Sequence, residues 1–391
     1  MSGVRALQVI DTLGMGGAET WLMEVLRRWA RSGEAFMDFL VTSGAEGVFD
    51  AEARALGARL HYLRYGRRSA LSFGQAFRAI LAKGRYDAIH DHQDFSSGWH
   101  FLMGAGALPP VRVTHVHNPA YQIRNNYGVT ASRRIVASIG RGLVRRYATC
   151  VTGTSRQVLS EYGFDAPAFA RIPKAALHCG FDTARFDGDR EVARAAVREE
   201  HGWPAASPLV LFAGRIDQSA ELDHPQNHKN SAFAVCAALA CLRICPGARF
   251  LFAGAPSPAV AILEQRVAAQ ARADHFAFVG VRRDIERLML ASDVLLFPSR
   301  GEGLGMVAVE AQAASLPVLA STAVPRECVV VPELVRFLDL AQGEDAWGGA
   351  IAALLANPPR VDGANERVAA SAFGIAQSAA ALRRLYETGR A

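Results

Sequence analysis

The chain has 391 residues, half of them hydrophobic and 20% charged, which is long enough for two globular domains. It has no apolar run of 18 residues and no apolar secretion segment at its start, so we expect a cytoplasmic protein without a membrane-spanning helix. The net charge of +6 is uneven, because residues 1–186 carry 23 basic and 14 acidic side chains; this excess predicts an acidic partner, such as a phosphate-bearing substrate or an anionic membrane surface.

Short apolar runs alternate with longer helical patterns along the whole chain. The predicted strands are 6–11, 37–43, 60–63, 88–92, 111–117, 150–155, 209–215, 249–254, 276–281, 293–299 and 316–321. Most are continuously apolar, as is typical of strands buried on both faces of a parallel sheet. We therefore predict an α/β protein with two doubly wound domains, whose ligands bind at the carboxyl ends of the strands.

The first predicted strand ends in a glycine-rich loop, DTLGMGGAET, ahead of an amphipathic helix. Glycines let the backbone approach a ligand closely, and a helix amino terminus favours an anion. The loop is not a dinucleotide-binding fingerprint, because Glu19 stands where that motif has its third glycine. An ordinary strand–helix turn remains the alternative.

Two further segments of the first half have more than one interpretation. The sequence HDHQD (90–94) resembles a metal-ligand cluster, but no third ligand group is placed, so a structural or cleft-wall role is favoured. Residues 122–146 hold six arginines and no acidic residue, with Ile135 and Ile139 one helical turn apart. Such a helix fits an anionic membrane or a lipid diphosphate; packing on its own domain with a solvated basic face is the alternative. We find no nucleic-acid-binding signature.

Two cations follow the strand at 209–215. Arg215 stands at its end, and Lys229 stands just before a predicted helix. The chain has only three lysines against 40 arginines, and Lys229 is the only lysine after residue 174. A compact ammonium at this point suits phosphate oxygens. The six cysteines form no Cys-x-x-Cys pair, and we expect reduced thiols without a metal.

The segment PSRGEGLGMVAVEA (298–311) places Glu302 in a glycine-rich loop and Glu310 in a helical pattern. Eight residues are about two helical turns, so both carboxylates are expected on one face, roughly 12 Å apart. That separation suits two contacts along one long ligand. With Arg215 and Lys229 on the phosphates and Glu310 on a ribose diol, the pattern indicates a nucleotide diphosphate.

Together these motifs resemble the retaining glycosyltransferases of family 4, which have the GT-B fold of two Rossmann-like domains facing across a cleft. The resemblance covers almost the whole chain and is most specific in FPSRGEGLGMVAVEAQAASLPVLAS, the family's Glu-x7-Glu element. Exopolysaccharide and capsule transferases are the most similar subgroup. The implied domains are residues 1–186 and 208–372, a link at 187–207, and a helix at 373–391 that crosses back to the first domain.

The resemblance implies a role for each matching position. Arg215 and Lys229 would clamp the pyrophosphate, Glu310 would hold the ribose and Glu302 the donor sugar. His117 matches the family's first-domain histidine, with His115 as its rival. The other donor-side positions are Gly16, Gly17, Val281, Gly303, Leu304 and Gly305, and the acceptor-side positions are Glu19, His115, Asn118 and Arg124. Thirteen residues, 216–228, separate Arg215 from Lys229 where the family usually has four, which leaves the substrate size open.

We therefore expect a metal-independent, retaining transferase that moves a sugar from a nucleotide diphosphate, UDP by preference, to a lipid-linked saccharide of the cell envelope. It would need no cofactor and would be cytoplasmic, peripheral at the inner face of the membrane if the basic helix binds lipid. DGD (187–189) resembles the metal motif of another glycosyltransferase fold, but a solvated loop is favoured. Two alternatives stay open: the same chemistry on a small natural-product acceptor, and a sugar-nucleotide-binding regulator without turnover.

Overall fold

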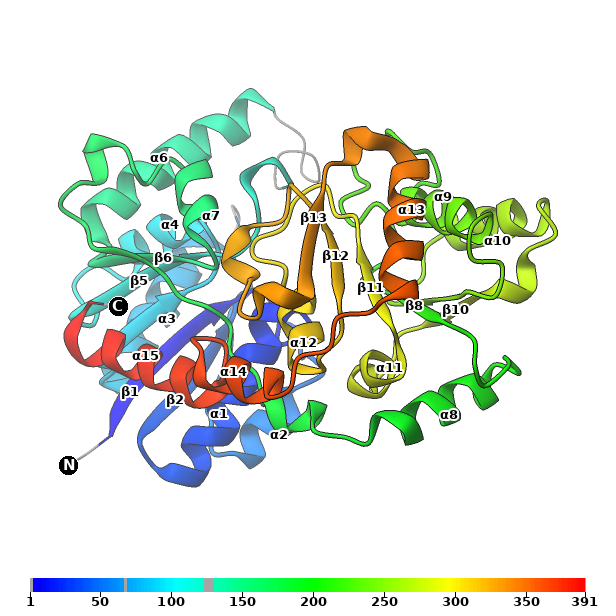
Figure 1. Cartoon of the computed structure of the whole chain (residues 1–391). Helices are drawn as coiled ribbons and strands as arrows, with labels where there is room; N and C mark the ends of the chain where they lie inside the picture. Colours follow the sequence, from blue (N-terminus) through cyan, green and yellow to red (C-terminus); the bar gives the residue numbers. More distant parts are fainter. Residues whose placement is uncertain (1–2, 67–68, 123–129, 391) are drawn as a thin grey trace. The chain divides into compact units, whose positions relative to one another are not determined.

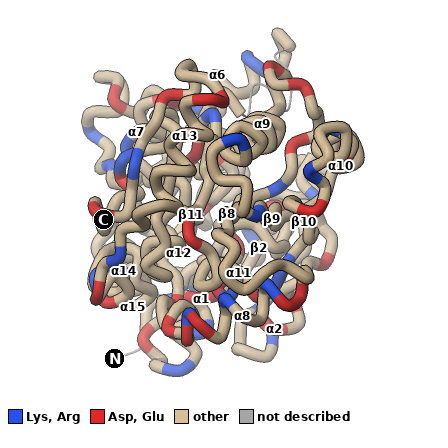
Figure 2. Tube along the Cα trace, turned by 45° about the vertical axis from the view of Figure 1, so that its right-hand side comes forward, with Lys and Arg blue, Asp and Glu red and all other residues tan. Residues whose placement is uncertain are grey.

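The computed structural model describes residues 3–66, 69–122 and 130–390, which form two compact units (Figure 1). Unit 1 contains Met1–Phe181 and Ala372–Ala391, and unit 2 contains Asp182–Ser371. Basic and acidic residues occur along the traces of both units (Figure 2). Within the described ranges, no helix combines the length and apolarity needed to cross a membrane.

Unit 1 is built on a seven-stranded sheet with the strand order β3-β2-β1-β4-β5-β6-β7, in which every neighbouring pair is parallel. The strands are β1 (Val4–Ile10), β2 (Ala35–Val41), β3 (Leu60–Tyr62), β4 (Ala88–Asp91), β5 (Val111–Val116), β6 (Cys150–Gly153) and β7 (Lys174–Ala176). The helices are α1 (Gly17–Ser32), α2 (Asp50–Ala55), α3 (Ala70–Gly84), α4 (Ser96–Met103), α6 (Ala131–Tyr147), α7 (Arg156–Glu161) and α15 (Ile375–Thr388). Since β4 returns to the other side of β1, the strand order reverses between these two strands, and ligands of doubly wound sheets bind at such a point.

Unit 2 repeats the same winding with six parallel strands in the order β10-β9-β8-β11-β12-β13. The strands are β8 (Leu209–Ala213), β9 (Arg249–Ala253), β10 (Phe276–Gly280), β11 (Val294–Phe297), β12 (Val318–Ser321) and β13 (Val335–Leu338). The helices are α8 (Arg190–Glu200), α9 (Ser231–Leu242), α10 (Ala259–Ala268), α11 (Ile285–Ala291), α12 (Met306–Ala313), α13 (Gly343–Ala356) and α14 (Ala364–Ala370). The order reverses between β8 and β11. Two doubly wound units confirm the predicted fold class.

The cores explain why the apolar runs became central strands. In unit 2, Val210 and Phe212 of β8 are buried with Leu296 of β11 and with Trp347 of α13. The helix α9 is buried almost all round and packs closely against α13. The Phe233 and Trp347 rings meet edge to face between the two helices, with centroids 5.6 Å apart. The apolar surface buried in this core stabilises the strands whose ends carry the candidate site.

The predicted link at 187–207 differs from the structure. This segment belongs to unit 2 and folds largely into α8, which packs against α11 and buries Ala193, Val197 and Arg198. Asp189, the second aspartate of DGD, caps α8 by accepting hydrogen bonds from the backbone amides of residues 191 and 192 at 2.8 and 3.0 Å. The charged residues of this segment favoured the prediction of a linker, although one stripe of the helix is buried.

The chain returns to unit 1 after Ser371. Phe181 and Gly374 form an isolated parallel bridge, and α15 then packs on α1 and β1. Ser378 of α15 accepts a hydrogen bond from the Trp21 indole at 2.8 Å, and Tyr386 is almost fully buried. The terminal helix is therefore part of the core of unit 1.

Candidate active site

The glycine loop of unit 1 joins β1 to α1, whose N-cap is Gly16. A Cβ atom on Gly16 would lie 2.2 Å from a carboxylate oxygen of Glu19, so the Glu19 side chain folds back onto this glycine. Burial, with a smaller contribution from Asp11, raises the pKa of Glu19. Among the described residues, no atom beyond its own helix and chain neighbours lies within 4 Å of the Cβ position of Gly17. The loop is therefore open at Gly17, whereas the Glu19 carboxylate covers Gly16.

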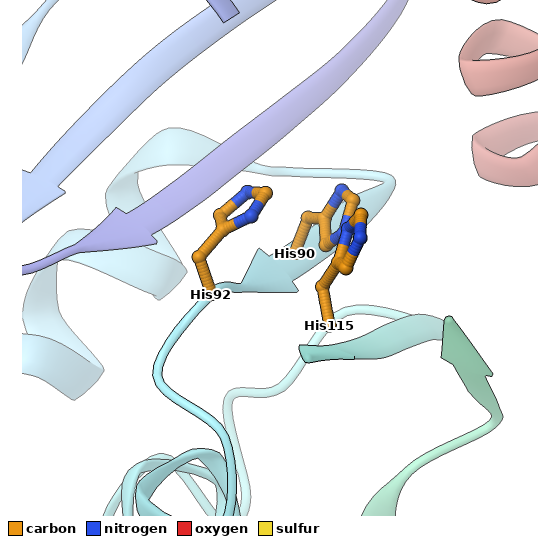
Figure 3. A group of neighbouring side chains, drawn as sticks. All are labelled: His90, His92 and His115. Carbon is orange, nitrogen blue, oxygen red and sulfur yellow. The ribbon is translucent and has the colours of Figure 1, made fainter. Parts of the chain in front are cut away.

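Four histidines stack at the carboxyl ends of β4 and β5. Figure 3 shows three of them, His90, His92 and His115, with their rings turned toward one another. The ring centroids of His115 and His117 are 4.0 Å apart and those of His90 and His92 are 4.2 Å apart. Burial holds the pKa of His90, His92 and His115 well below the ordinary value and lowers that of His117 to about 4. All four rings are therefore neutral at neutral pH.

Hydrogen bonds assign the tautomer of His117. The amide oxygen of Gln8 can only accept, so His92 donates from Nε2 to it across 3.0 Å. A neutral His92 must then accept at Nδ1, where the Nε2–H of His117 lies 2.8 Å away. His117 is left with Nδ1 as a hydrogen-bond acceptor.

A second branch of the network reaches α15. The Gln8 amide donates to the Tyr386 hydroxyl at 2.8 Å, and this hydroxyl lies 2.8 Å from Nδ1 of His90. Since His90 is the only other described group within its reach, Tyr386 donates to it, and His90 in turn donates from Nε2 to Nδ1 of His115 at 3.0 Å. Gln8 and Tyr386 were not predicted; the only signal was a glutamine inside the apolar run ALQVID.

The same contacts decide how HDHQD (90–94) is interpreted. His90, His92 and His115 place one nitrogen each within 4.8 Å of one another, as metal ligands do. However, both ring nitrogens of His90 and of His92 already take part in hydrogen bonds, and a metal ion would have to break them. The arrangement favours the structural interpretation.

The two rival histidines, His115 and His117, differ in their exposure. His115 has no exposed surface and lies against Trp21, with ring centroids 5.9 Å apart, so it does not reach a substrate directly. His117 is only half-buried at the end of β5, and Asn118 after it is exposed. Arg124, the other acceptor-side candidate, lies outside the described residues.

In unit 2, the insertion at 216–228 folds back on itself. The buried carboxylate of Asp217 accepts hydrogen bonds from the backbone amides of Lys229 at 3.0 Å and Ser231 at 2.8 Å. The aliphatic part of Lys229 runs over Gly214, with Cδ 3.6 Å from the position of a Cβ there. The insertion therefore leaves Lys229 beside the end of β8, next to the exposed Arg215.

Lys229 forms an ion pair with Glu302. Its ammonium lies 2.7 and 3.0 Å from the two carboxylate oxygens, and 5.9 Å from the centre of the Phe297 ring. The Glu302 side chain is 11% exposed and that of Lys229 is 28% exposed. These two residues, 73 positions apart in the sequence, meet where the strand order of the sheet reverses.

The glycine loop after β11 differs from the predicted geometry. The helix α12 begins only at Met306, after Gly305 with a φ of 93°, a left-handed conformation that suits glycine. Glu302 therefore precedes the helix, and the two-turn spacing to Glu310 was wrong, because a tight turn through Gly303 and the buried Leu304 intervenes.

Glu310 is a half-buried carboxylate near Arg185 and Glu286, which pair with each other at 2.9 Å. Burial, more than the charge of Glu286, raises the pKa of Glu310. Within the described chain, no side-chain hydrogen bond engages it. Val281, just after β10, is 58% exposed and offers an apolar surface at the same edge of the sheet.

Comparisons with known proteins identify the same two halves. A model described as Glycosyltransferase Family 4 matches residues 15–185, and a model described as Glycosyl transferases group 1 matches residues 207–357. EpsF of Bacillus subtilis (strain 168), whose name describes it as a glycosyltransferase, is 29% identical over 386 residues, or 98% of this chain and 96% of EpsF. D-inositol 3-phosphate glycosyltransferase of Mycobacterium avium (strain 104) is 29% identical over 306 residues, or 74% of this chain and 65% of that protein.

Solved structures share the fold. HepE from Anabaena in complex with UDP superposes with a TM-score of 0.77 at 17% identity, covering 99% of this chain and 100% of HepE. WaaG, a glycosyltransferase involved in lipopolysaccharide biosynthesis, gives a TM-score of 0.63 at 14% identity over 98% of this chain and 95% of WaaG. Since the two family models span both units and EpsF aligns with nearly the whole sequence, the chain belongs to the family 4 glycosyltransferases, with the GT-B fold.

Proposed function

We propose that this glycosyltransferase takes its sugar from a UDP-sugar, retains the configuration of the anomeric carbon and needs no metal ion. The observation that carries this proposal is the placement of Lys229, Arg215 and Glu302 at the reversal point of the unit 2 sheet. HepE has been solved with UDP and with UDP-glucose, which favours the same donor class here.

Each polar group suits one part of such a donor. Lys229 and Arg215 match the two phosphates, and Glu310, free of side-chain hydrogen bonds within the described chain, suits the two hydroxyls of a ribose. Exposed Val281 suits the face of the base. Once Lys229 pairs with the donor phosphates, Glu302 would be free to contact the sugar.

The proposed reaction breaks the bond between the anomeric carbon and the phosphate oxygen. Negative charge develops on the leaving diphosphate, and Lys229 and Arg215 stabilise it in place of a metal ion. The acceptor hydroxyl enters on the face that the diphosphate leaves, its oxygen bonds to the anomeric carbon, and its proton passes to the departing phosphate. Entry and departure on one face retain the configuration.

The proposed acceptor is a lipid-linked saccharide at an anionic membrane, and α6 supports it. The helix is anchored through the buried Gly140 and Val144. Ile135, Val136 and Ile139 are instead 60, 43 and 46% exposed, and the surrounding segment has no acidic residue. Apolar side chains among arginines are typical of a helix that lies in a membrane surface. This exposure favours the membrane over packing of the whole helix on its own unit.

The test uses the full-length protein with a panel of UDP-, GDP-, ADP- and dTDP-sugars, measuring binding of each nucleotide by calorimetry and donor hydrolysis or transfer by chromatography. UDP should bind most tightly, EDTA should leave turnover unchanged, and NMR of the product should show the donor's anomeric configuration. Tight UDP binding without hydrolysis or transfer to any acceptor would instead identify a regulatory protein.

A further inference from the structure

One face of α8 carries a row of arginines. Arg190, Arg194 and Arg198 recur every fourth residue, so their side chains project from one side of the helix. All three reach the start of β11, where Asp293 is buried. Arg194 hydrogen-bonds to the Asp293 carboxylate, and Arg198 approaches it at 3.3 Å.

This carboxylate is shared among more positive groups than it can neutralise. Arg360, from the segment between α13 and α14, also lies 3.5 Å from Asp293, and the backbone amide of Leu209 donates to it at 2.9 Å. Arg198 is fully buried and is satisfied by backbone carbonyls, which makes it a structural group. Glu191 lies 3.9 Å from Arg194, but its side chain is 85% exposed, so solvent screens this pair strongly. The excess charge therefore lies on Arg190, Arg194 and Arg360.

Arg190 lacks a carboxylate partner of its own. Its terminal nitrogens donate to the backbone carbonyls of Ser292 and Ala314, while its buried Nε has no acceptor in the part of the chain that the structure describes. Burial, followed by repulsion from Arg360, lowers the pKa of Arg190 to about 10. An anion beside this guanidinium would relieve both effects.

The side chains of these three arginines line an open pocket of about 460 Å³, whose wall also includes Glu191, Pro208, Asp293 and Pro358. The pocket lies at the amino ends of β8 and β11, whereas Arg215 and Glu302 follow their carboxyl ends. A strand of five residues is roughly 16 Å long at about 3.3 Å per residue. The pocket is therefore separate from the proposed donor site, at the opposite edge of the same sheet.

We propose that Arg190, Arg194 and Arg360 bind a phosphate group of a small molecule in this pocket, as a second ligand site of unit 2. Guanidinium groups match the oxygens of a phosphate with paired hydrogen bonds, and a dianion balances the local excess charge better than a single carboxylate does. The volume accommodates a phosphorylated metabolite rather than a lone ion.

Pyrophosphate is the probe, titrated calorimetrically into the full-length Lys229→Ala variant, in which the proposed donor site has lost its lysine. One saturable site should remain. Arg360→Gln in this background should weaken binding about tenfold or more, as expected for the loss of a charge-assisted hydrogen bond. Since the Arg360 side chain is 40% exposed, its replacement should leave the fold intact. Arg190→Gln is the second variant and should act in the same direction.

Arg243→Gln is the matched control. It removes one arginine charge from the same unit, at a side chain that is 62% exposed and paired with Asp345. Equal pyrophosphate affinities for Arg360→Gln and Arg243→Gln, or no saturable binding in the Lys229→Ala protein, would overturn the proposal. A separate measurement distinguishes this pocket from the proposed donor site. The Arg360→Gln protein with Lys229 intact should bind UDP as tightly as the parent does.

Discussion

The ammonium of Lys229 lies between the two carboxylate oxygens of Glu302, at 2.7 and 3.0 Å. Glu302 thus holds the lysine in the way that a phosphate would. Under the proposed function, a nucleotide-sugar donor would have to displace this carboxylate, so loss of the pair should change donor affinity and turnover in opposite directions.

Glu302→Gln should therefore bind UDP more tightly than the parent, by up to about tenfold. Glutamine has nearly the same shape as glutamate but no charge, so Lys229 no longer has to leave an ion pair before it binds phosphate. Turnover should fall on the order of 10²-fold or more, since the proposed contact to the transferred sugar would be weakened. Calorimetry with UDP and a steady-state assay give the two values. Glu264→Gln, at an exposed position of α10, is the control for lost negative charge. Weaker UDP binding in Glu302→Gln would contradict the idea that phosphate replaces Glu302 as the partner of Lys229.

Lys229→Ala should reduce kcat/KM by roughly 10²-fold, because in the proposed reaction the ammonium stabilises charge that develops on the leaving diphosphate. The free energy of unfolding should change much less, since the lysine side chain is 28% exposed. The matched control is Lys83→Ala, a lysine at an exposed position in α3 of unit 1. Unchanged kcat/KM in a folded Lys229→Ala protein would remove this residue from the site.

Glu310 predicts a pH dependence of donor binding. In the proposed ribose contact only the ionised form would accept hydrogen bonds from both hydroxyls, and burial raises the pKa of Glu310. UDP affinity should therefore fall on acidification at a higher pH than an ordinary glutamate, with a pKa of about 4.3, would allow. Glu310→Gln should bind UDP more weakly, by about 1.5–3 kcal/mol, and should lack this acid loss. Equal affinity of parent and variant by calorimetry would exclude the ribose contact.

The histidine network predicts acid-sensitive stability. All four imidazoles have a lowered pKa in the folded state, so the unfolded chain binds more protons below its histidine pKa of about 6.5. The contribution of the neutral histidines to the free energy of unfolding is fully present above that pH and is lost as the pH falls toward 4. Each neutral histidine adds a slope of about 1.4 kcal/mol per pH unit.

Denaturant unfolding at several pH values between 7.5 and 5 measures this slope. His117→Gln removes one titrating ring and should make the slope shallower by one histidine. Tyr386→Phe should cost about 1–3 kcal/mol at neutral pH, because it removes the hydroxyl that pairs with the buried Gln8 amide nitrogen and with Nδ1 of His90. A stability that does not change between pH 7 and 5 would show that these rings are not held neutral.

Binding of α6 to membranes is tested with vesicles of phosphatidylglycerol and phosphatidylcholine. The parent should bind the anionic vesicles at low salt and dissociate as the salt is raised, because exposed charges are screened beyond about 8–10 Å at physiological ionic strength. Replacement of Arg133, Arg134, Arg145 and Arg146 by glutamine should abolish binding, at about 1 kcal/mol per residue.

Arg141 is retained in that variant, because it bonds to the carbonyl of Gly163 and lies over the Phe169 ring. UDP affinity should be unaffected, since the proposed nucleotide contacts lie in unit 2. If the parent ignores anionic vesicles at low salt, the membrane proposal fails, and a small soluble acceptor takes its place.

Much of the fold was predictable because parallel strands buried on both faces leave long apolar runs, as LVLFA in β8 does. The strands β7 and β13 were missed, since KAA and VRFL are short and only partly buried. The linker prediction at 187–207 was wrong because the buried stripe of α8 includes Arg198, whose charge hides a core position from a hydrophobic pattern.

The candidate site was predictable only as a set of residues. Glycine loops and a rare lysine identified Lys229 and Glu302, but their pairing depends on two loops 73 positions apart. The histidine network depends on Tyr386, which follows His90 by 296 positions. Such contacts arise from the winding of the sheets, which no local pattern encodes. Asp217, whose carboxylate closes the insertion, looked like an ordinary loop residue.

The position of α15 within unit 1 has a consequence for the order of folding. Unit 2 is contiguous, and a ribosome completes it before α15 emerges, whereas unit 1 begins first and is finished last. Until Tyr386 arrives, the Gln8 amide and Nδ1 of His90 lack their partner, and Trp21 lacks Ser378. We therefore expect nascent chains to hold a folded second half beside an unfinished first half, and a stop codon ahead of residue 375 to yield a protein whose unit 2 survives proteolysis while unit 1 is degraded.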